Sequence, residues 1–177
     1  MSVLQATTQP IASRILMNAW INQKLAHAYI FDGPAGSGRR EMALQLAALL
    51  FCEHVQAQQP CGQCAPCKQL SSGNHPDFLE IEPDGNSIKI QQMRDLKENY
   101  SFKSTQSSMK ICLIHRAELM TAEAANSLLK FLEEPVSQML IILETSNYFG
   151  IIQTIRSRAA RISFRSLPKE QIISRII

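Results

Sequence analysis

The chain has 177 residues, of which 45% are hydrophobic and 19% are charged, and its formal net charge is +3. This length and composition are typical of a globular protein with one full core and room for a small insert. A net charge of +3 is too small to indicate a nucleic-acid-binding protein by itself. No apolar run approaches the ~20 residues of a membrane span, and the N-terminus lacks a signal-peptide pattern. We therefore expect a cytoplasmic protein with no membrane partner.

The first predicted elements are a strand over residues 28–31, a glycine-rich loop over residues 33–38 and a helix over residues 42–51. This order is the context that the phosphate-binding signature G-x-x-x-x-G-K-[ST] requires. The glycines of the loop are Gly33, Gly36 and Gly38. They can let backbone N–H groups curl around phosphate oxygens at the positive end of a helix. A glycine-rich turn unrelated to nucleotide binding is the alternative.

Two arginines replace the residues that carry the chemistry of this signature. Arg39 stands at the lysine position and Arg40 at the serine or threonine position. The lysine is a compact charge on the outer phosphates, whereas a guanidinium is planar and bulkier. The hydroxyl ligates magnesium, which a second cation at that position would repel. We therefore expect weak phosphate binding at most, and no hydrolysis of Mg-ATP by this chain.

Four cysteines follow the predicted helix with the spacing C-x8-C-x2-C-x2-C. They are Cys52, Cys61, Cys64 and Cys67. Four thiolates are the number of ligands that a closed, tetrahedral structural zinc site needs. Pro60, Gly62 and Pro66 are expected to break any helix here, so that the chain can wrap until the sulfurs converge. Two disulfides or an iron–sulfur cluster are the alternatives, although a reducing cytosol disfavours disulfides.

The position that would supply an acidic magnesium ligand also lacks the residue that an active ATPase needs. Residues 110–114 form a short apolar run typical of a buried parallel strand, in which Cys112 is expected to be a core residue. In an active P-loop ATPase an acidic residue at the end of such a strand holds magnesium. Here His115 and Arg116 occupy that place, and neither can act as a carboxylate. We expect His115 to be structural rather than a metal ligand.

An amphipathic helix and another apolar strand follow. Thr121 is suited to cap a helix over residues 121–134, which Pro135 would end. The strand over residues 139–143 leads into the polar segment 144–147. A side chain of that segment could reach a phosphate bound to the glycine loop, or the segment could simply form a turn.

Basic residues gather late in the chain, at Arg156, Arg158, Arg161 and Arg165. An arginine delivered from one subunit into the ATP site of another stabilises charge on the transferring phosphoryl group. Arg158, which lies between Ser157 and the small Ala159, is the candidate for such an arginine finger. The charge pattern alone favours a solvated basic face over this interpretation.

Together these motifs resemble the clamp-loader family of AAA+ ATPases, and within it the bacterial delta-prime type of subunit. The resemblance covers nearly the whole chain. Its most specific parts are the segments 124–135 (AANSLLKFLEEP) and 154–158 (TIRSR), together with the four-cysteine insert. The segments 26–31, 75–77 and 88–94 also carry it.

The resemblance implies a P-loop AAA+ domain over residues 1–165, an α/β fold in which helices flank a parallel sheet. A four-cysteine zinc module is expected as an insert at about residues 52–70. Residues 166–177 resemble the start of the small helical lid that follows this domain in the family. Because the chain stops within an amphipathic run, we expect it to be the N-terminal portion of a longer protein.

The resemblance also implies site residues. Motor subunits of the family carry Lys-Thr at the end of the loop and Asp-Glu after the second strand, whereas this chain has arginines and His115-Arg116 there. It is therefore similar to the non-motor type. Arg158 matches the arginine finger of the family's Ser-Arg-Cys motif, although Ala159 replaces the cysteine. Thr145 matches a sensor position, whose task lapses if no nucleotide binds.

The predicted function is that of a non-hydrolysing subunit that helps a pentameric ATPase load a sliding clamp onto primed DNA. The implied partners are motor subunits of the gamma or tau type, a delta subunit and, through the complex, the clamp and primer-template DNA of the DNA polymerase III holoenzyme. Zn²⁺ is the implied structural cofactor, and ATP is not expected to bind. The alternatives are a motor-type subunit that binds ATP and a zinc-dependent DNA-binding module.

Overall fold

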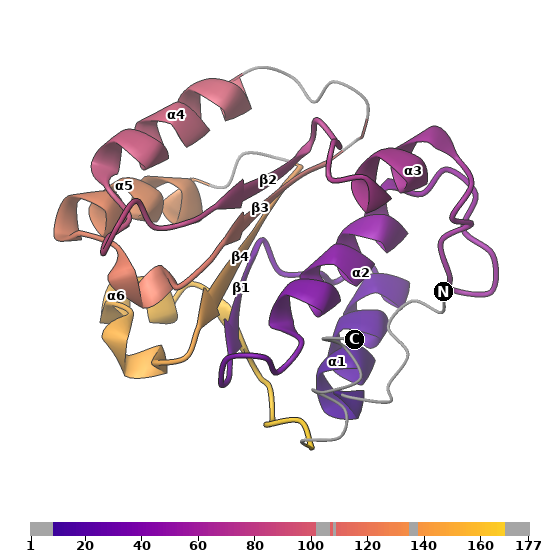
Figure 1. Cartoon of the computed structure of the whole chain (residues 1–177), viewed down its shortest axis with the longest axis horizontal. Helices are drawn as coiled ribbons and strands as arrows, with labels where there is room; N and C mark the ends of the chain where they lie inside the picture. The colour runs from indigo at the N-terminus through magenta and orange to yellow at the C-terminus, as the bar shows by residue number, and fades with distance from the viewer. Residues whose placement is uncertain (1–8, 102–106, 108, 135–137, 169–177) are drawn as a thin grey trace.

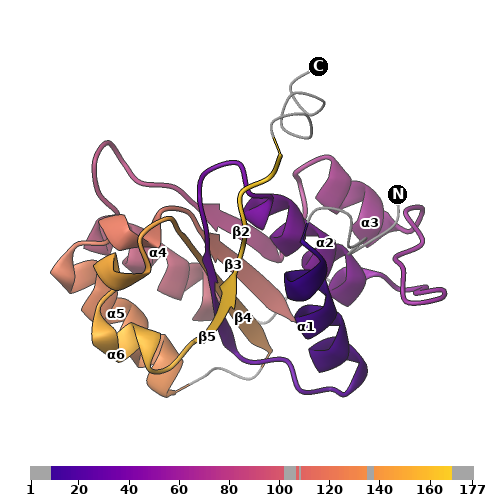
Figure 2. The same cartoon turned by 90° about the horizontal axis from the view of Figure 1, so that it is seen from below.

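The computed structural model of the chain describes residues 9–101, 107, 109–134 and 138–168. Five parallel strands form one sheet in the order β2-β3-β4-β1-β5 (Figures 1 and 2). In chain order the strands are β1 (Ala28–Asp32), β2 (Phe78–Ile81), β3 (Lys110–Ile114), β4 (Met139–Thr145) and β5 (Ala160–Ser163). Because the strands are parallel, their carboxyl ends lie along the same edge of the sheet, where α/β proteins place their ligands.

Helices cover both faces of this sheet (Figures 1 and 2). One face carries α1 (Pro10–Ile21), α2 (Arg39–Phe51) and α3 (Ala65–Ser71). The other face carries α4 (Ile90–Ser101), α5 (Ala122–Glu133) and the short α6 (Gln153–Arg156). The single-turn helices η1 (Ala117–Leu119) and η2 (Tyr148–Gly150) follow β3 and β4. The predicted α/β fold, a parallel sheet flanked by helices, is confirmed.

Alternate residues of the central strands build two separate cores. Tyr29 and Phe31 of β1 pack with α1 and α2, whereas Ala28 and Ile30 pack with α4 and α5. The same alternation runs through β3, where Cys112 is 0% exposed, as predicted for a core residue. Burial on both faces explains why these strands read as continuous apolar runs in the sequence.

Most predicted elements are present, with shifted ends. The Thr121 side chain accepts a hydrogen bond from the N–H of Ala124 at 3.2 Å, which confirms it as the cap of α5. α2 begins at Arg39, earlier than predicted, because the left-handed Gly38 (φ 87°) turns the loop directly into the helix. β4 continues past the predicted end to Thr145.

Two predictions fall partly or wholly outside the described residues. Pro135, which we expected to end α5, is not among them, and neither are residues 169–177 of the expected lid segment 166–177. Within the described ranges, no helix is both long enough and apolar enough to cross a bilayer.

Candidate functional site

The glycine loop joins the end of β1 to the start of α2. The N–H of Gly33 donates to the carbonyl of Thr145 at the tip of β4, at 3.0 Å. A Cβ at Gly33 would lie 2.7 Å from the Cβ and the carbonyl oxygen of Phe164, so no larger residue fits. Gly36 and Gly38 have φ values of 76° and 87°, in the left-handed region that favours glycine. All three predicted glycines are therefore required by the backbone geometry of this loop.

A buried glutamine also fastens the loop to the residues that follow β5. Gln9, only 5% exposed, donates through Nε2 to the carbonyl of Ser37 at 3.0 Å. The same side chain pairs with the backbone of Arg165, donating to its carbonyl at 2.6 Å and accepting from its N–H at 3.1 Å. The loop is thus held by the start of α1 as well as by the sheet.

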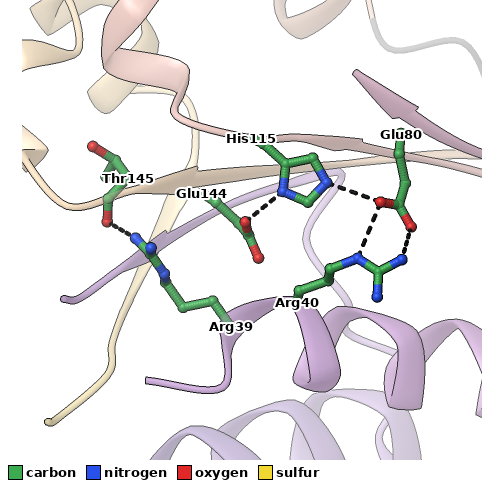
Figure 3. Close-up of polar contacts among 6 residues, drawn as sticks. All are labelled: Arg39, Arg40, Glu80, His115, Glu144 and Thr145. Carbon is green, nitrogen blue, oxygen red and sulfur yellow. Dashed lines mark hydrogen bonds and ion pairs between the residues drawn. The ribbon is translucent and has the colours of Figure 1, made fainter. Parts of the chain in front are cut away.

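Arg39, at the lysine position, is the first residue of α2. Its guanidinium donates through Nη1 to the backbone carbonyl of Thr145 (Figure 3). The hydroxyl of Thr145 accepts the N–H of Asn147 at 2.9 Å, so the predicted sensor residue takes part in a local turn. Arg39 therefore binds the protein's own backbone at the position from which a lysine would reach outer phosphates.

Arg40 begins a series of charged contacts that reaches across the edge of the sheet (Figure 3). Its guanidinium forms two hydrogen bonds to Glu80 of β2, Nε to Oε2 at 3.1 Å and Nη2 to Oε1 at 2.7 Å. His115, just after β3, contacts Glu80 through Nε2 at 3.0 Å and Glu144 of β4 through Nδ1 at 2.7 Å. We call these four residues the charged network. It joins the two positions at which the nucleotide motifs depart from an active ATPase.

The geometry of the charged network requires a protonated His115. An ionised carboxylate only accepts hydrogen bonds, so both ring nitrogens must donate for His115 to bond Glu80 and Glu144 together. The hydrogen bond to Glu144 raises the pKa of His115; burial opposes this rise and the bond to Glu80 adds to it. Burial by itself raises the pKa of Glu80, but hydrogen bonds from Arg40 and His115 outweigh it and lower that pKa. The charged network thus pairs two basic side chains with two acidic ones.

The charged network runs from the interior to the surface. The side chains of Glu144 and His115 are 8% and 13% exposed, whereas that of Glu80 is 26% and that of Arg40 is 53% exposed. The second carboxylate oxygen of Glu144, Oε1, has no hydrogen-bond partner among the described residues. The inner pair, His115 with Glu144, is therefore the one whose loss leaves a charge in low dielectric.

Arg158 lies outside the charged network, between α6 and β5. Its N–H bonds the carbonyl of Ile155 at 2.9 Å, and Ile155 is 0% exposed in the core. Its guanidinium donates to the carbonyl of Thr154 at 2.9 Å and the hydroxyl of Ser157 at 3.3 Å, and pairs with Glu133 of α5 at 3.0 Å. A fixed backbone thus carries a partly exposed guanidinium.

The neighbouring arginines have partners of their own. Arg156 lies over the rings of Tyr148 and Phe149, at 5.2 Å and 5.1 Å from their centroids. Arg161 lies 3.9 Å from the centroid of Tyr148 and pairs with Asp32 at the end of β1. Arg156 and Arg161 are therefore each held by aromatic contacts, and Arg161 also by an ion pair.

The four cysteines converge as predicted. The Sγ atoms of Cys52, Cys61, Cys64 and Cys67 all lie within 4.8 Å of one another. A tetrahedral zinc ion with Zn–S bonds of ~2.3 Å would hold its sulfurs about 3.8 Å apart, so this donor set fits the ion after a small contraction.

The backbone of the cysteine cluster favours thiolate at one of its members. The N–H groups of Gln63 and Cys64 point at the sulfur of Cys61, at 3.4 Å and 3.3 Å. These backbone hydrogen bonds lower the pKa of the Cys61 thiol to about 6. Burial raises the pKa of Cys67 to about 12, so in the metal-free protein this thiol keeps its proton. Metal binding would release it.

One part of the cysteine prediction was wrong. Pro66 does not break a helix but lies in the first turn of α3, beside Cys67. Proline is tolerated there because the backbone N–H that it lacks would have no partner within the helix. The chain wraps instead at the tight turn 56–59, whose end residues bond each other's backbones. Its central residues, Ala57 and Gln58, both have positive φ, 48° and 61°.

His75 is a buried residue that packs against the end of α2. Its ring stacks on Phe51, the last residue of α2, with centroids 4.0 Å apart and planes within 5°. Its Nδ1 accepts the N–H of Asp77 at 3.1 Å, and burial lowers the pKa of His75. Asp77 is 0% exposed and accepts the N–H of Ser107 at 2.9 Å. A neutral histidine therefore packs between the end of α2 and the start of β2.

Comparison with known proteins places the chain in a family. The profile of the family described as DNA polymerase III, delta subunit, matches residues 8–168 of the chain. The chain belongs to this family. The chain is also 41% identical over 169 residues to the DNA polymerase III subunit delta′ of Bacillus subtilis, an alignment that covers 96% of this chain and 51% of that protein. The predicted resemblance to the delta-prime type is confirmed.

The chain is also similar to other subunits of DNA polymerase III. It is 33% identical over 164 residues to the tau subunit of Bacillus subtilis, covering 93% of this chain and 29% of tau. The chain thus spans about half or less of these relatives. Among solved structures, a gamma subunit-related protein from Thermotoga maritima matches with a TM-score of 0.67 and 28% identity, over 89% of this chain and 47% of that one. The RuvB Holliday junction branch migration motor of the same organism, at 14% identity and TM-score 0.56 over 93% of this chain and 45% of RuvB, shares the fold.

Sequence reasoning on this delta-family chain missed two residues of the site. Glu80 interrupts the apolar run of β2, and an acid inside a short apolar run was the only signal available in the sequence. Gln9 carried no signal, because its partners, Ser37 and Arg165, come from distant parts of the chain.

Proposed function

We propose that this chain is a clamp-loader subunit of DNA polymerase III that does not hydrolyse ATP and that supplies Arg158 to the ATP site of an adjacent motor subunit. Its partners in this role are motor subunits of the gamma or tau type and a delta subunit. Through the assembled complex it acts on the sliding clamp and primer-template DNA. Residues 1–165 form the AAA+ domain of this proposal, with the insert at about residues 52–70, and residues 166–177 begin the lid.

The charged network is the observation that carries this proposal. Magnesium needs oxygen ligands in near-octahedral geometry and gives up its waters reluctantly. At the two positions that would hold it, this chain has Arg40 and a doubly hydrogen-bonded His115, both cationic. The nearby carboxylates of Glu80 and Glu144 already pair with those cations. Recruiting either carboxylate to a metal would leave Arg40 or His115 without its counterion.

The hydrogen bond made by Arg39 supports the absence of ATP hydrolysis on the side of the phosphates. Its guanidinium is bonded to the Thr145 carbonyl, so phosphate binding through this side chain would require that contact to break. The first N–H groups of α2 remain as weak phosphate donors, as at any helix start. Weak phosphate binding without magnesium gives no phosphoryl transfer.

The surroundings of Arg158 support its role as an arginine finger. The residue follows a helix anchored in the core by Ile155, and its side chain is 37% exposed. The guanidinium is therefore presented from a rigid backbone and can meet a second subunit. In trans, such an arginine accelerates phosphoryl transfer by about 10³–10⁵-fold.

We also propose that Cys52, Cys61, Cys64 and Cys67 bind a structural Zn²⁺ ion. Four sulfur ligands leave no open position for substrate, so the metal would supply stability and no catalysis. It would cross-link the connection between α2 and α3, which contains the strained turn 56–59.

The proposal is tested with a clamp loader rebuilt from full-length subunits. Arg158→Ala should lower clamp- and DNA-stimulated ATP turnover by about 10³-fold or more while assembly stays intact. Arg158→Lys, which keeps the charge but lacks the planar fork, should recover only a small part of this loss. Unchanged turnover in an assembled complex would remove the finger assignment.

Two further measurements separate the alternatives. Titration of the purified subunit with labelled Mg-ATP should show no saturable binding at micromolar concentrations, whereas a motor-type subunit would bind. DNA affinity that falls with salt and disappears on metal chelation would instead support a zinc-dependent DNA-binding module.

A further inference from the structure

We infer that Glu133 is a positioning residue for Arg158, whose carboxylate fixes the guanidinium on the surface of this chain in the orientation that meets the neighbouring subunit's nucleotide. This inference rests on the proposed role of Arg158. It assigns a role to the Leu-Glu-Glu-Pro part of the segment 124–135, which the proposed function leaves unexplained.

Three contacts from two helices hold the guanidinium. The carbonyl of Thr154 and the hydroxyl of Ser157 both accept from Nη1, at 2.9 Å and 3.3 Å, and both belong to the same turn of chain as Arg158. Glu133 accepts from Nη2 at 3.0 Å and belongs to α5. Contacts to Nη1 alone leave the plane of the guanidinium free to pivot. The Nη2 contact with Glu133 removes that freedom.

Restricting this side chain matters because arginine has many rotamers. Ordering a free arginine side chain therefore has a large cost in conformational entropy. Glu133 meets part of that cost before the subunits assemble, because α5 is anchored in the core by Leu128 and Leu132. The orientation of the finger is therefore fixed by α5, which is twelve residues long, as well as by the four-residue α6.

The position of Glu133 is unfavourable for α5 itself. It is the last residue of the helix, where the partial negative charge of the helix dipole repels a carboxylate. Arg158 offsets that repulsion. The next residue, Glu134, has the same charge and is exposed, but it forms no ion pair with any described residue. Glu134 is therefore a matched control for the charge at this helix end.

The test compares Glu133→Gln and Glu134→Gln in the rebuilt full-length clamp loader, each alone and combined with Arg158→Ala. An exposed ion pair is worth up to about 1 kcal/mol, so Glu133→Gln should lower kcat by up to about fivefold. The KM for ATP and the yield of assembled complex should not change, since the motor subunit binds ATP. Glu134→Gln should behave as wild type.

The combined variants distinguish positioning from a structural role. If Glu133 acts only through Arg158, Glu133→Gln should have no further effect once Arg158 is alanine. A Glu133→Gln variant with wild-type kcat, or with raised kcat, would overturn the inference while the Arg158→Ala loss still supported the finger. If Arg158→Ala itself left turnover unchanged, the proposed function would fail, and with it the inference.

Discussion

Replacing His115 by alanine should lower the free energy of unfolding by about 3 kcal/mol near pH 6. The substitution removes the partner of Glu144, whose side chain is 8% exposed and whose other oxygen has no partner among the described residues. A carboxylate left without its partner in such a place costs about 3–5 kcal/mol, and we take the lower figure because the Arg40–Glu80 pair remains.

The effect should depend on pH in a defined direction. The pKa of His115 is raised in the folded protein, because its hydrogen bond to Glu144, helped by Glu80, outweighs burial. The stability that the charged ring contributes is therefore complete below the unfolded pKa of about 6.5 and is lost as the pH rises through the folded pKa. The difference in unfolding free energy between wild type and His115→Ala should accordingly shrink as the pH is raised from about 6.5 through that folded pKa.

Urea unfolding of wild type, His115→Ala, Glu144→Gln and the double variant measures both the loss and its origin. The double variant should be more stable than the sum of the single losses predicts, by about 1–3 kcal/mol, because Glu144→Gln removes the charge that His115→Ala exposes. Arg40→Gln is the control at the outer end, where the side chain is 53% exposed, and should cost at most about 1 kcal/mol. A His115→Ala loss below about 0.5 kcal/mol, or one that does not change with pH, would refute the charged network as a source of stability.

Three other predictions follow from contacts at the same edge and in the insert. Glu80→Gln should destabilise the chain by about 1–2 kcal/mol at neutral pH in urea unfolding. Because the pKa of Glu80 is lowered in the folded state, this difference from wild type should vanish as the pH falls through that pKa. Gly33→Ala should reduce the unfolding free energy by about 1–3 kcal/mol, because the added Cβ would lie 2.7 Å from Phe164. Gly36→Ala has open space around it and should cost only about 1–2 kcal/mol, because of the positive φ at that position. Chelation of the metal-loaded protein should lower its melting temperature, and Cys64→Ser should abolish both the bound zinc in elemental analysis and this sensitivity to chelators.

The elements of the fold that could be predicted are those whose sequence signal is local. The continuous apolar runs of β1, β3 and β4 predicted strands, and for β3 a buried parallel one, while Thr121 marked the start of α5. β2 was missed because it is four residues long and contains Glu80, which breaks its apolar pattern. Pro66 was predicted to break a helix but lies in the first turn of α3, because the sequence alone does not distinguish a proline that interrupts a helix from one that begins it.

The candidate site was predictable in its differences from an active ATPase but not in its new contacts. Arg40 and His115 could each be recognised from motif spacing as unsuited to magnesium. Their connection through Glu80 could not, because it depends on β2 lying next to β3 in the sheet order. The partner of Arg158 was likewise invisible, since Glu133 and Arg158 meet only because α5 and α6 pack together.

The pairing of Gln9 with Arg165 has a mechanical consequence. The amide of Gln9 bonds the backbone of Arg165, two residues after the end of β5, by donating to its carbonyl and accepting from its N–H. The same nitrogen also holds Ser37 in the glycine loop. A displacement of the chain at Arg165 must therefore either break these two hydrogen bonds or pull on the glycine loop, so the Gln9 side chain couples the segment after β5 to that loop.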